Sequence, residues 1–528
     1  MKKYALVLLL LAGAMDAFAQ FPQIKWWFDT GDSAFGQAAS GDIDNDGKPE
    51  IVFGCYRNDS MVYALNAENG SLLWKYNTHT ASTEGCNDTA PILYDTDQDG
   101  SLEVLVPSSC NPRTFCFRGS DGAIKWSTPT AGSDSPPTIA DLDGDGTPEL
   151  LHGGFDGRVM CINAENGSIA WTVTLHSNAW VQTAPTIADL DGNGQPDFVA
   201  ATWAFGSDTS RVYAYRGDNH ALLWRRSMPD VMYHGSAVAN LDNDTLPELV
   251  IGAYNGKVYA LNGENGSIAW SHQADFYVGA PVTVADLDLD GNCDILYCDA
   301  YGVGALSKSG TALWHYAIPG SGTAFRGVAV ADIDGDEMPD VCFGTSNGRV
   351  IVLNGADGAL IWNLNLAAHY GGAFEIDHAP LLDDFDGDGN IDVFIAGGYT
   401  QYPDFSNNYG RAYLIAAGPG KGPAWTMFQR DIRRQSNACA AVYSGLPDAA
   451  PPQAPRLRAY PNPGRALVSV ETPEPGTLAF RDALGRIVLE RSATTPRTQL
   501  DISHLPAGRY WMALYTAKGT AGGTLLKE

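Results

Sequence analysis

The stretch Asp42-Ile-Asp-Asn-Asp-Gly-Lys-Pro-Glu50 has acidic side chains at its first, third, fifth and ninth positions and a glycine at its sixth. When such a loop curls, the first three carboxylates point to one centre, the glycine permits the sharp turn, and Glu50 closes the shell. The carbonyl group of the seventh residue can add another oxygen. Oxygen ligands of this number and flexibility suit Ca²⁺, whereas Mg²⁺ demands a stricter octahedron. The stretch therefore predicts a calcium-binding loop.

Eight copies of this pattern occur along the chain, about 50 residues apart, and a repeat of this length is typical of a propeller or a solenoid. A solvated acidic turn explains one copy but not eight in register, so we expect up to eight Ca²⁺ ions. Loops five and seven are expected to bind most weakly, because Thr245 and Glu337 replace their glycines. The predicted ligands, loop by loop, are Asp42, Asp44, Asp46 and Glu50; Asp95, Asp97, Asp99 and Glu103; Asp141, Asp143, Asp145 and Glu149; Asp189, Asp191, Asn193 and Asp197; Asn240, Asp242, Asp244 and Glu248; Asp286, Asp288, Asp290 and Asp294; Asp332, Asp334, Asp336 and Asp340; and Asp384, Asp386, Asp388 and Asp392.

The residues around each loop repeat as well. An apolar strand precedes the loop, a second follows it, and glycine-containing turns lead to a third strand and to a fourth that carries a tryptophan. Four short antiparallel strands repeated eight times predict an all-β fold, an eight-bladed β-propeller, with seven blades as the alternative. One extra strand, at residues 26–28 or 437–443, is expected to close the ring. The tryptophans expected to pack between blades are Trp74, Trp126, Trp171, Trp224, Trp270, Trp314, Trp362 and Trp425.

The chain has 61 acidic and 33 basic residues and a net charge of -28, which disfavours nucleic acid as a partner. About half of the acidic residues are predicted loop ligands, so bound Ca²⁺ would neutralise much of this charge. The acidity therefore indicates a fold that needs calcium more than it indicates an acidic surface.

Residues 1–19 have the features of a secretory signal peptide: a positive start, an apolar run from Tyr4 to Ala14 and an Ala-x-Ala site that ends at Ala19. The run is too short to span a bilayer comfortably, and no other segment is apolar enough, so the mature chain is expected to have no transmembrane segment. Export permits disulfides among the nine cysteines. The pairs Cys110–Cys116 and Cys293–Cys298 are close enough in sequence to form locally, and the odd number leaves at least one cysteine over.

The acidic loop between two blade strands resembles the FG-GAP (VCBS) repeat of integrin-α-type propellers, in which this loop binds Ca²⁺ on the lower rim. Two segments are similar to the blade repeat of quinoprotein (PQQ-like) propellers: Tyr63-Ala-Leu-Asn-Ala-Glu-Asn-Gly-Ser-Leu-Leu-Trp74 and residues 259–270. The two resemblances cover about residues 24–445, and we assign the propeller to residues 20–445. They imply a fold rather than an activity, since both families include many members that only bind or scaffold.

A Pro/Ala-rich linker at residues 446–455 precedes a second domain at residues 456–528. This domain contains Tyr460-Pro-Asn-Pro463, then Phe480-Arg-Asp-Ala-Leu-Gly-Arg486, then Leu500-Asp-Ile-Ser-His-Leu-Pro-Ala-Gly-Arg-Tyr510. It resembles the type A C-terminal sorting domain of the Bacteroidota type IX secretion system, and its short strands predict a small β-sandwich. The resemblance implies the secretion machinery as a partner and a location at the outer cell surface or outside the cell. An ordinary adhesion-type β-domain is the alternative.

In propellers, the loops that lead from one blade into the next lie on the face opposite the calcium loops. Aromatic, basic and acidic side chains around a concave mouth on that face suit a carbohydrate or a peptide, although some of the aromatic rings could instead pack between blades. The candidate ligand-binding residues are Trp180, Tyr233, His234, Phe325, Arg326, Asp377 and His378, and Phe35, Asp88, Asp134, Gln182 and Tyr277 belong to the same ring.

These features predict a secreted or cell-surface, calcium-stabilised module for binding or adhesion to extracellular carbohydrate or protein ligands. One alternative is a polysaccharide lyase, since calcium-loaded eight-bladed rhamnogalacturonan lyases resemble this architecture; His234, His378, Arg326 and Asp377 would be its acid–base candidates. No lyase motif matches residue by residue, so the balance is against an enzyme. A purely structural surface component is another alternative. A quinoprotein dehydrogenase is disfavoured, because the chain lacks a pair of adjacent cysteines.

Overall fold

The computed structural model describes residues 21–439, apart from residues 82, 243, 402 and 403. It also describes residues 458–527, apart from residues 461–464, 472–474, 482–486, 494–496 and 517–518. The predicted signal peptide and the predicted linker lie outside the described residues.

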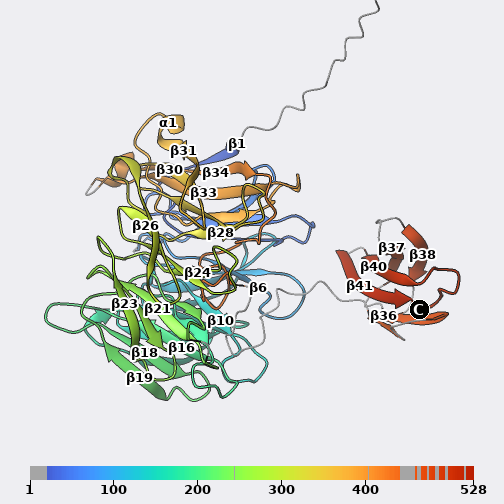
Figure 1. The fold of residues 1–528 in the computed structure, drawn as a ribbon, viewed down its shortest axis with the longest axis horizontal. Coiled ribbons are helices and arrows are strands. Elements are labelled where there is room, and N and C mark those ends of the chain that lie inside the picture. The colour runs from blue at the N-terminus through green and yellow to red at the C-terminus, as the bar shows by residue number, and fades with distance from the viewer. Residues whose placement is uncertain are drawn as a thin grey trace, which may run out of the picture.

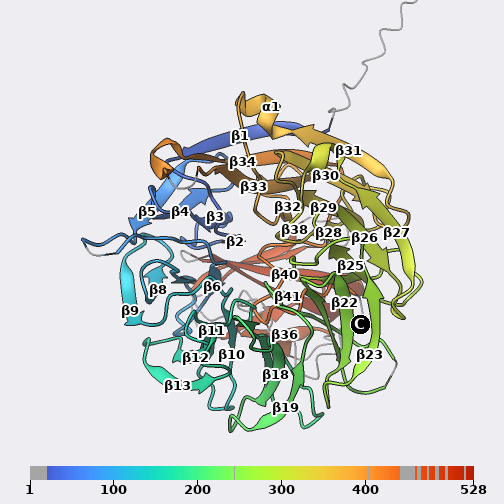
Figure 2. The same ribbon diagram turned by 90° about the vertical axis from the view of Figure 1, so that its left-hand side faces the viewer.

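Residues 23–418 form eight four-stranded antiparallel sheets, which are arranged as the blades of a ring (Figures 1 and 2). The predicted all-β fold with eight blades is confirmed, and the seven-bladed alternative is wrong. In the first seven blades the strands run from the innermost to the outermost in chain order. The second strand of each of the first seven blades is buried along its whole length, as β3 is (Glu50–Gly54), because neighbouring blades cover both of its faces.

The strands of blades one to four are β2 (Ala38–Gly41), β3, β4 (Met61–Asn66) and β5 (Leu72–Asn77); β6 (Ile92–Tyr94), β7 (Glu103–Pro107), β8 (Arg113–Arg118) and β9 (Ile124–Pro129); β10 (Thr138–Ala140), β11 (Glu149–Gly153), β12 (Arg158–Asn163) and β13 (Ile169–Thr174); and β15 (Thr186–Ala188), β16 (Asp197–Ala201), β18 (Arg211–Arg216) and β19 (Leu222–Ser227). A two-stranded ribbon, β14 (Ala179–Trp180) and β17 (Trp203–Ala204), accompanies blade four.

The strands of blades five to seven are β20 (Ala237–Ala239), β21 (Glu248–Ala253), β22 (Lys257–Asn262) and β23 (Ile268–Gln273); β24 (Thr283–Ala285), β25 (Asp294–Cys298), β26 (Gly302–Leu306) and β27 (Ala312–Ala317); and β28 (Ala329–Ala331), β29 (Asp340–Gly344), β30 (Arg349–Asn354) and β31 (Leu360–Asn365). The described helices are short: η1 (Pro319–Ser321), α1 (Leu366–Tyr370) and η2 (Phe405–Asn407).

Blade eight closes the ring with strands from both ends of the propeller. It contains β32 (Leu381–Asp383), β33 (Ile391–Tyr399) and β34 (Tyr409–Gly418), and its outermost strand is β1 (Gln23–Thr30), which pairs with β34. The extra strand predicted at residues 26–28 therefore closes the ring. Residues 437–439 instead form a single bridge to Val284, and residues 440–443 lie outside the described residues.

A tryptophan of each outermost strand fastens one blade to the next. The indole Nε1 atoms of seven of them donate hydrogen bonds of 2.5–3.0 Å to backbone carbonyls of the following blade. Trp74 shows the arrangement: it bonds to Gly119 O, and its ring packs so closely on Gly122 that a Cβ there would lie 2.7 Å away. The predicted role between blades is confirmed for the six of these tryptophans that the sequence predicted. It is also confirmed for Trp171, whose ring stacks on Phe198 of the next blade at 5.5 Å, but Trp425 is a wrong assignment. Trp26 of β1 occupies the outer-strand position of blade eight, because that strand comes from the start of the chain.

Trp425 lies in a segment at residues 422–439, hereafter the channel segment, which runs once around the inside of the ring. Its backbone forms hydrogen bonds of 2.7–3.1 Å with the innermost strands of seven blades, or with the residue that follows the strand. The side chain of Arg434 reaches the remaining one, blade two, by donating to Pro91 O at 3.2 Å. The inside of the ring is therefore lined by the protein's own chain. Its backbone partners are Asp332, Leu382, Ser40, Ile139, Ile187, Val238 and Val284.

Residues 458–527 form two further sheets with their own hydrophobic cluster, to which Val470, Phe480, Leu500 and Leu514 contribute. One sheet contains β35 (Arg458–Tyr460), β36 (Leu467–Glu471) and β39 (Arg497–Asp501). The other contains β38 (Ile487–Ala493), β37 (Gly476–Arg481), β40 (Gly508–Thr516) and β41 (Gly519–Lys527).

Candidate functional site

The loops that lead from one blade into the next bring polar side chains from several blades together at one end of the channel. We call Asp134, Gln182, Tyr233, His234, Arg326 and Asp377 the mouth cluster. Its members precede blades three, four, five, seven and eight. Four of the predicted ligand residues, Tyr233, His234, Arg326 and Asp377, are thus in this cluster, and the ring of Phe325 packs 5.6 Å from that of Tyr233.

His234 and Arg326 form the centre of the cluster. His234 Nδ1 donates to Gly279 O at 2.8 Å, since a carbonyl oxygen can only accept, and Nε2 therefore accepts from Arg326 Nη1 at 2.7 Å. Complete burial and the neighbouring guanidinium lower the pKa of His234 well below its ordinary value. Arg326 also donates through Nε to Asp377 Oδ1 at 3.2 Å. His234 is a neutral positioning residue here, with both ring nitrogens engaged.

Asp134 lies on the other side of Tyr233. Its Oδ2 accepts from the Tyr233 hydroxyl at 3.0 Å and from Gln182 Nε2 at 2.7 Å. Burial and the nearby Asp88 carboxylate raise the pKa of Asp134. Three buried acceptor atoms at this mouth, Asp134 Oδ1, Gln182 Oε1 and Gln429 Oε1, have no hydrogen-bond partner among the described residues. Such atoms are costly unless water or a ligand satisfies them.

Aromatic rings extend this polar cluster across blades three to six. Trp203 makes edge contacts with Tyr233 at 5.9 Å and with Tyr254 at 5.0 Å, and Tyr254 stacks on Tyr277 at 5.0 Å. Trp180 packs between Phe155 and Phe205 and is 37% exposed, as is Tyr277. We call Trp180, Trp203, Tyr254 and Tyr277 the aromatic strip.

The channel segment also contributes residues to the mouth. Phe428 is almost completely buried, packs against Ala90 and Ala379, and lies 6.3 Å from the His234 ring. The neighbouring Gln429 donates to Ser236 O at 3.3 Å. The repeats indicated the position of the mouth, but no pattern in the sequence indicated that Gln429 belongs to it. Tyr254 was also missed, although it occupies the same kind of turn as Trp203.

Two predicted residues lie apart from the cluster. Trp180 belongs to the aromatic strip. His378 is 2% exposed and packs its ring 5.8 Å from Phe394, and both of its ring nitrogens lack partners among the described residues. Burial lowers the pKa of His378 to about 3, so this ring is neutral.

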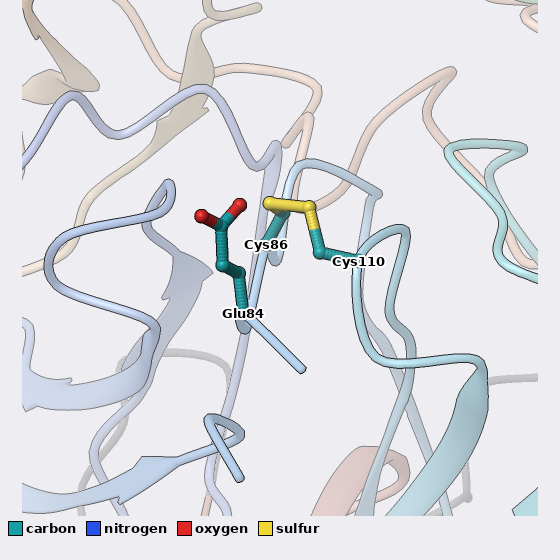
Figure 3. A group of neighbouring side chains, drawn as sticks. All are labelled: Glu84, Cys86 and Cys110. Carbon is teal, nitrogen blue, oxygen red and sulfur yellow. A yellow bond between two sulfur atoms is a disulfide. The ribbon is translucent and has the colours of Figure 1, made fainter. Parts of the chain in front are cut away.

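A disulfide braces the wall of the mouth. Cys86, in the loop before blade two, bonds to Cys110, and the adjacent Ser109 hydroxyl donates to Asp88 Oδ1 at 2.5 Å. Figure 3 shows the Glu84 carboxylate beside this disulfide. The three residues are close enough to hold a metal ion, but oxidised sulfur is not a thiolate ligand, so we assign no metal there. The local pair Cys110–Cys116 is therefore wrong.

The second disulfide joins Cys293 of acidic loop six to Cys439 at the end of the channel segment. The local pair Cys293–Cys298 is also wrong, because the circuit of the channel segment brings a distant cysteine to this loop. The five remaining cysteines, Cys55, Cys116, Cys161, Cys298 and Cys342, are buried and unpaired.

The eight acidic loops join the first and second strands of their blades. In loop one, Asp42 accepts hydrogen bonds from the backbone N–H groups of Asp46 and Gly47 at 3.0 Å, and Gly47 has φ 91°. Glu337 occupies the equivalent position in loop seven with φ 68°, a conformation that costs a residue with a Cβ about 1 kcal/mol. The predicted turn at position six is thus present in both loops.

The acid at the ninth position is buried in every loop, with exposures of 0–7%. In loop one, Glu50 Oε2 accepts from Ile43 N at 2.9 Å, while Oε1 has no partner among the described residues. The same holds for Asp197 Oδ1, Glu248 Oε1 and Asp340 Oδ1. Burial, together with the loop's other carboxylates, raises the pKa of Glu50 to about 8.

An unpartnered buried carboxylate oxygen facing other carboxylates is the donor set that a hard cation requires. In loops one and three, oxygens of Asp42, Asp44 and Glu50 and of Asp141, Asp143 and Glu149 lie within 4.8 Å of one another. These residues fit Ca²⁺, which accepts six to eight oxygen ligands in flexible geometry. Oxygens of Asp95, Asp97 and Asp99 lie equally close together in loop two, but a lysine side chain reaches the ninth acid there, as it does in loop eight.

Comparison with known families identifies three parts of the chain. FG-GAP-like repeats match residues 42–106 and 95–152, a blade family described as outer membrane protein assembly factor BamB matches residues 208–429, and a secretion system C-terminal sorting domain matches residues 458–527. No curated protein sequence matches the chain.

Solved structures resemble the propeller at low sequence identity. The biofilm matrix protein Bap1 of V. cholerae has a TM-score of 0.56 and 16% identity, covering 80% of this chain and 99% of that one. Sqt1 of Saccharomyces cerevisiae has a TM-score of 0.52 and 13% identity, covering 74% and 98%. A europium-containing methanol dehydrogenase has a TM-score of 0.51 and 13% identity, covering 75% and 93%. At these identities the likeness shows the fold alone.

The sorting domain indicates secretion to the cell surface or outside the cell and an interaction with the secretion machinery. Among the described residues, no helix has the length and apolar character needed to cross a membrane. The chain is an eight-bladed β-propeller protein with FG-GAP-like and PQQ-like repeats and a secretion system C-terminal sorting domain.

Proposed function

We propose that this secreted propeller is a binding or adhesion module that holds an extracellular carbohydrate at the mouth cluster and the aromatic strip, with Ca²⁺ in its acidic loops. The observation that carries the proposal is the set of buried, unpartnered acceptors, Asp134 Oδ1, Gln182 Oε1 and Gln429 Oε1, beside half-exposed aromatic rings. Hydroxyl groups of a sugar can donate to these acceptors, while its apolar face stacks on the rings.

The candidate site combines residues of the blades with residues of the channel segment. Phe428 lies 6.3 Å from the His234 ring, and Gln429 donates to Ser236 O at 3.3 Å. Bap1, which shares the fold, is named as a biofilm matrix protein, and a role in an extracellular matrix agrees with a carbohydrate ligand. A protein ligand is the alternative outcome of the test below.

The lyase alternative gains no specific support from the mouth. His234 already donates to Gly279 O and accepts from Arg326, and Arg326 is also paired with Asp377. None of these three groups is positioned as a free acid or base. If the protein were a lyase, incubation with pectin fragments would produce unsaturated sugars that absorb in the ultraviolet.

A glycan array followed by titration of the strongest ligand tests the proposal. We expect Trp180→Ala to weaken binding about tenfold or more, because a lost stacking contact costs on the order of 1.4 kcal/mol or more. The matched control is Trp27→Ala, which removes a 51% exposed tryptophan from β1, on the outermost strand of blade eight. No glycan binding, binding of a protein only, or equal affinities for both variants and the wild type would contradict the carbohydrate site.

A further inference from the structure

A lysine ammonium group enters the acidic loop of two blades. Lys125 of β9 places Nζ 2.7 Å from Asp97 and 3.0 Å from Glu103 in loop two. Lys25 of β1 places Nζ 2.7 Å from Asp388 and 3.2 Å from the buried Asp392 in loop eight, and it also contacts Asp386. Each ammonium therefore lies among the carboxylates that would otherwise surround a cation.

Both lysines occupy the same place in the repeat, directly before the tryptophan of the outermost strand. The other six blades have apolar residues there: Leu73, Ala170, Leu223, Ala269, Leu313 and Ile361. The two lysines are thus a feature of the sequence of these two blades, and the apolar residues of the other six cannot supply a charge to their loops.

The presence of a lysine changes the contacts of the ninth-position acid. In loop two, Glu103 Oε1 is paired with Lys125, whereas the corresponding oxygens of Glu50 and Asp197 have no partner among the described residues. Arg216 in blade four does not change this, because it lies 3.3 Å from Asp191 and leaves the inner oxygen of Asp197 unpaired. In blades two and eight, the lysine directly before the tryptophan thus reaches the inner acid of its loop.

We infer that the chain's own lysines serve as the cations of loops two and eight, so that Ca²⁺ binds only in the other six loops. The inference rests on the proposed calcium role. A Ca²⁺ ion could enter either loop only by expelling an ammonium held by two or three carboxylates. The two lysine side chains are mostly buried, with exposures of 18% and 25%. Dissolved salt screens partly buried ion pairs less than exposed ones.

The ion pairs of Lys25 lie where the ring closes. Lys25 belongs to β1, the strand that completes blade eight, and its ion pairs join that strand to loop eight at any calcium concentration. Blades eight and two flank blade one, so in both neighbours of the first blade a lysine ammonium pairs with the loop carboxylates without a metal.

Calcium stoichiometry tests the inference, measured by equilibrium dialysis and elemental analysis of the full chain. Lys125→Met and Lys25→Met keep the length of the side chain and remove its charge, and each is expected to bind one Ca²⁺ more than the wild type. The double variant is expected to bind two more. Lys75→Met, which removes an exposed lysine directly after Trp74, is the matched control and should bind as the wild type does. A wild type that binds eight ions, or folded Met variants that bind no more than the wild type, would overturn the inference.

Chemical acetylation of the wild type gives a second measurement that does not depend on any variant. Lys25 and Lys125 should be labelled more slowly than Lys75, to the same extent with Ca²⁺ and with EDTA, at a temperature at which both forms stay folded. Labelling that rises with Ca²⁺ shows expulsion of the ammonium and contradicts the inference. A wild type that binds no Ca²⁺ contradicts the calcium role alone; the inference then fails if Lys25 and Lys125 are as reactive as Lys75.

Discussion

His152 shows how a single buried side chain makes the propeller sensitive to pH. It lies on β11, is fully buried, and donates through Nδ1 to Gly153 O at 2.8 Å, so its Nε2 accepts from the Thr114 hydroxyl at 2.8 Å. Thr114 belongs to β8 of the preceding blade, so this bond joins two blades. Protonation of Nε2 would remove the acceptor.

We predict that His152→Gln reduces the loss of stability at acidic pH. Burial lowers the pKa of His152 to about 4 in the folded protein, whereas it is about 6.5 in an unfolded chain. The neutral form therefore stabilises the fold fully above about pH 6.5, and this contribution is lost as the pH falls towards 4. Glutamine cannot become charged, so the stability difference between wild type and variant should shift by about 2 kcal/mol between pH 7 and pH 5.

Denaturant unfolding at the two pH values, with Ca²⁺ kept saturating, measures this shift. The control is His79→Gln, which makes the same substitution at an exposed position. Parallel pH profiles for the wild type and His152→Gln would show that His152 does not carry the effect.

Among the elements, the channel segment is the one that the repeats did not predict. It contains no blade strand, yet it contacts the innermost part of all eight blades. Its Arg434 is completely buried and donates to Pro91 O, Pro137 O and Phe428 O, and burial lowers the pKa of this guanidinium to about 9. A charge is tolerated there because three carbonyl oxygens surround it.

We predict that the double variant Cys293→Ala/Cys439→Ala lowers the melting temperature of the propeller. The disulfide closes a loop of 146 residues in sequence and fixes the end of the channel segment to loop six. Removal of a native disulfide commonly costs about 2–5 kcal/mol, because the unfolded chain regains freedom. Calorimetry of the variant measures the loss, and Cys342→Ala, which changes an unpaired buried cysteine, separates the loss of the bond from the loss of packing. A double variant no less stable than Cys342→Ala would contradict the prediction.

At the scale of elements, the sequence predicts those features that repeat in every blade. The strands, the positions of the acidic loops and the outer-strand tryptophans of the first seven blades depend on neighbours within about 50 residues, and the structure confirms where they lie. The role of Trp425 and both disulfides were not, because they depend on where the channel segment runs after its last blade. The mouth residues were identified by their place before each blade, but the contact of Asp134 with Gln182 and Tyr233 joins three blades and has no signature in one repeat.

At the scale of the whole molecule, the net charge of -28 is concentrated in one kind of loop. The ninth-position acids are buried beside other carboxylates, and burial raises the pKa of Glu149, Asp197 and Glu248 to about 7 each. A carboxylate in such a place prefers to be neutral unless a cation accompanies it. If the inference about loops two and eight is right, Lys125 and Lys25 provide that cation in two blades, and we propose that Ca²⁺ provides it in the others.

We therefore predict that chelation by EDTA lowers the melting temperature of the propeller and that excess Ca²⁺ restores it. Each site stabilises the fold by about 2.7 kcal/mol when free Ca²⁺ is 100 times its dissociation constant, so several sites together give a large shift. Mg²⁺ at the same concentration should restore less, because its smaller octahedral shell does not fit these flexible loops. The variant Lys25→Met/Lys125→Met should lose more stability on chelation than the wild type, since it has no lysine ammonium in loops two and eight. Identical melting curves with and without EDTA would contradict the calcium role of the loops, and an equal loss in both proteins would contradict the role of the two lysines.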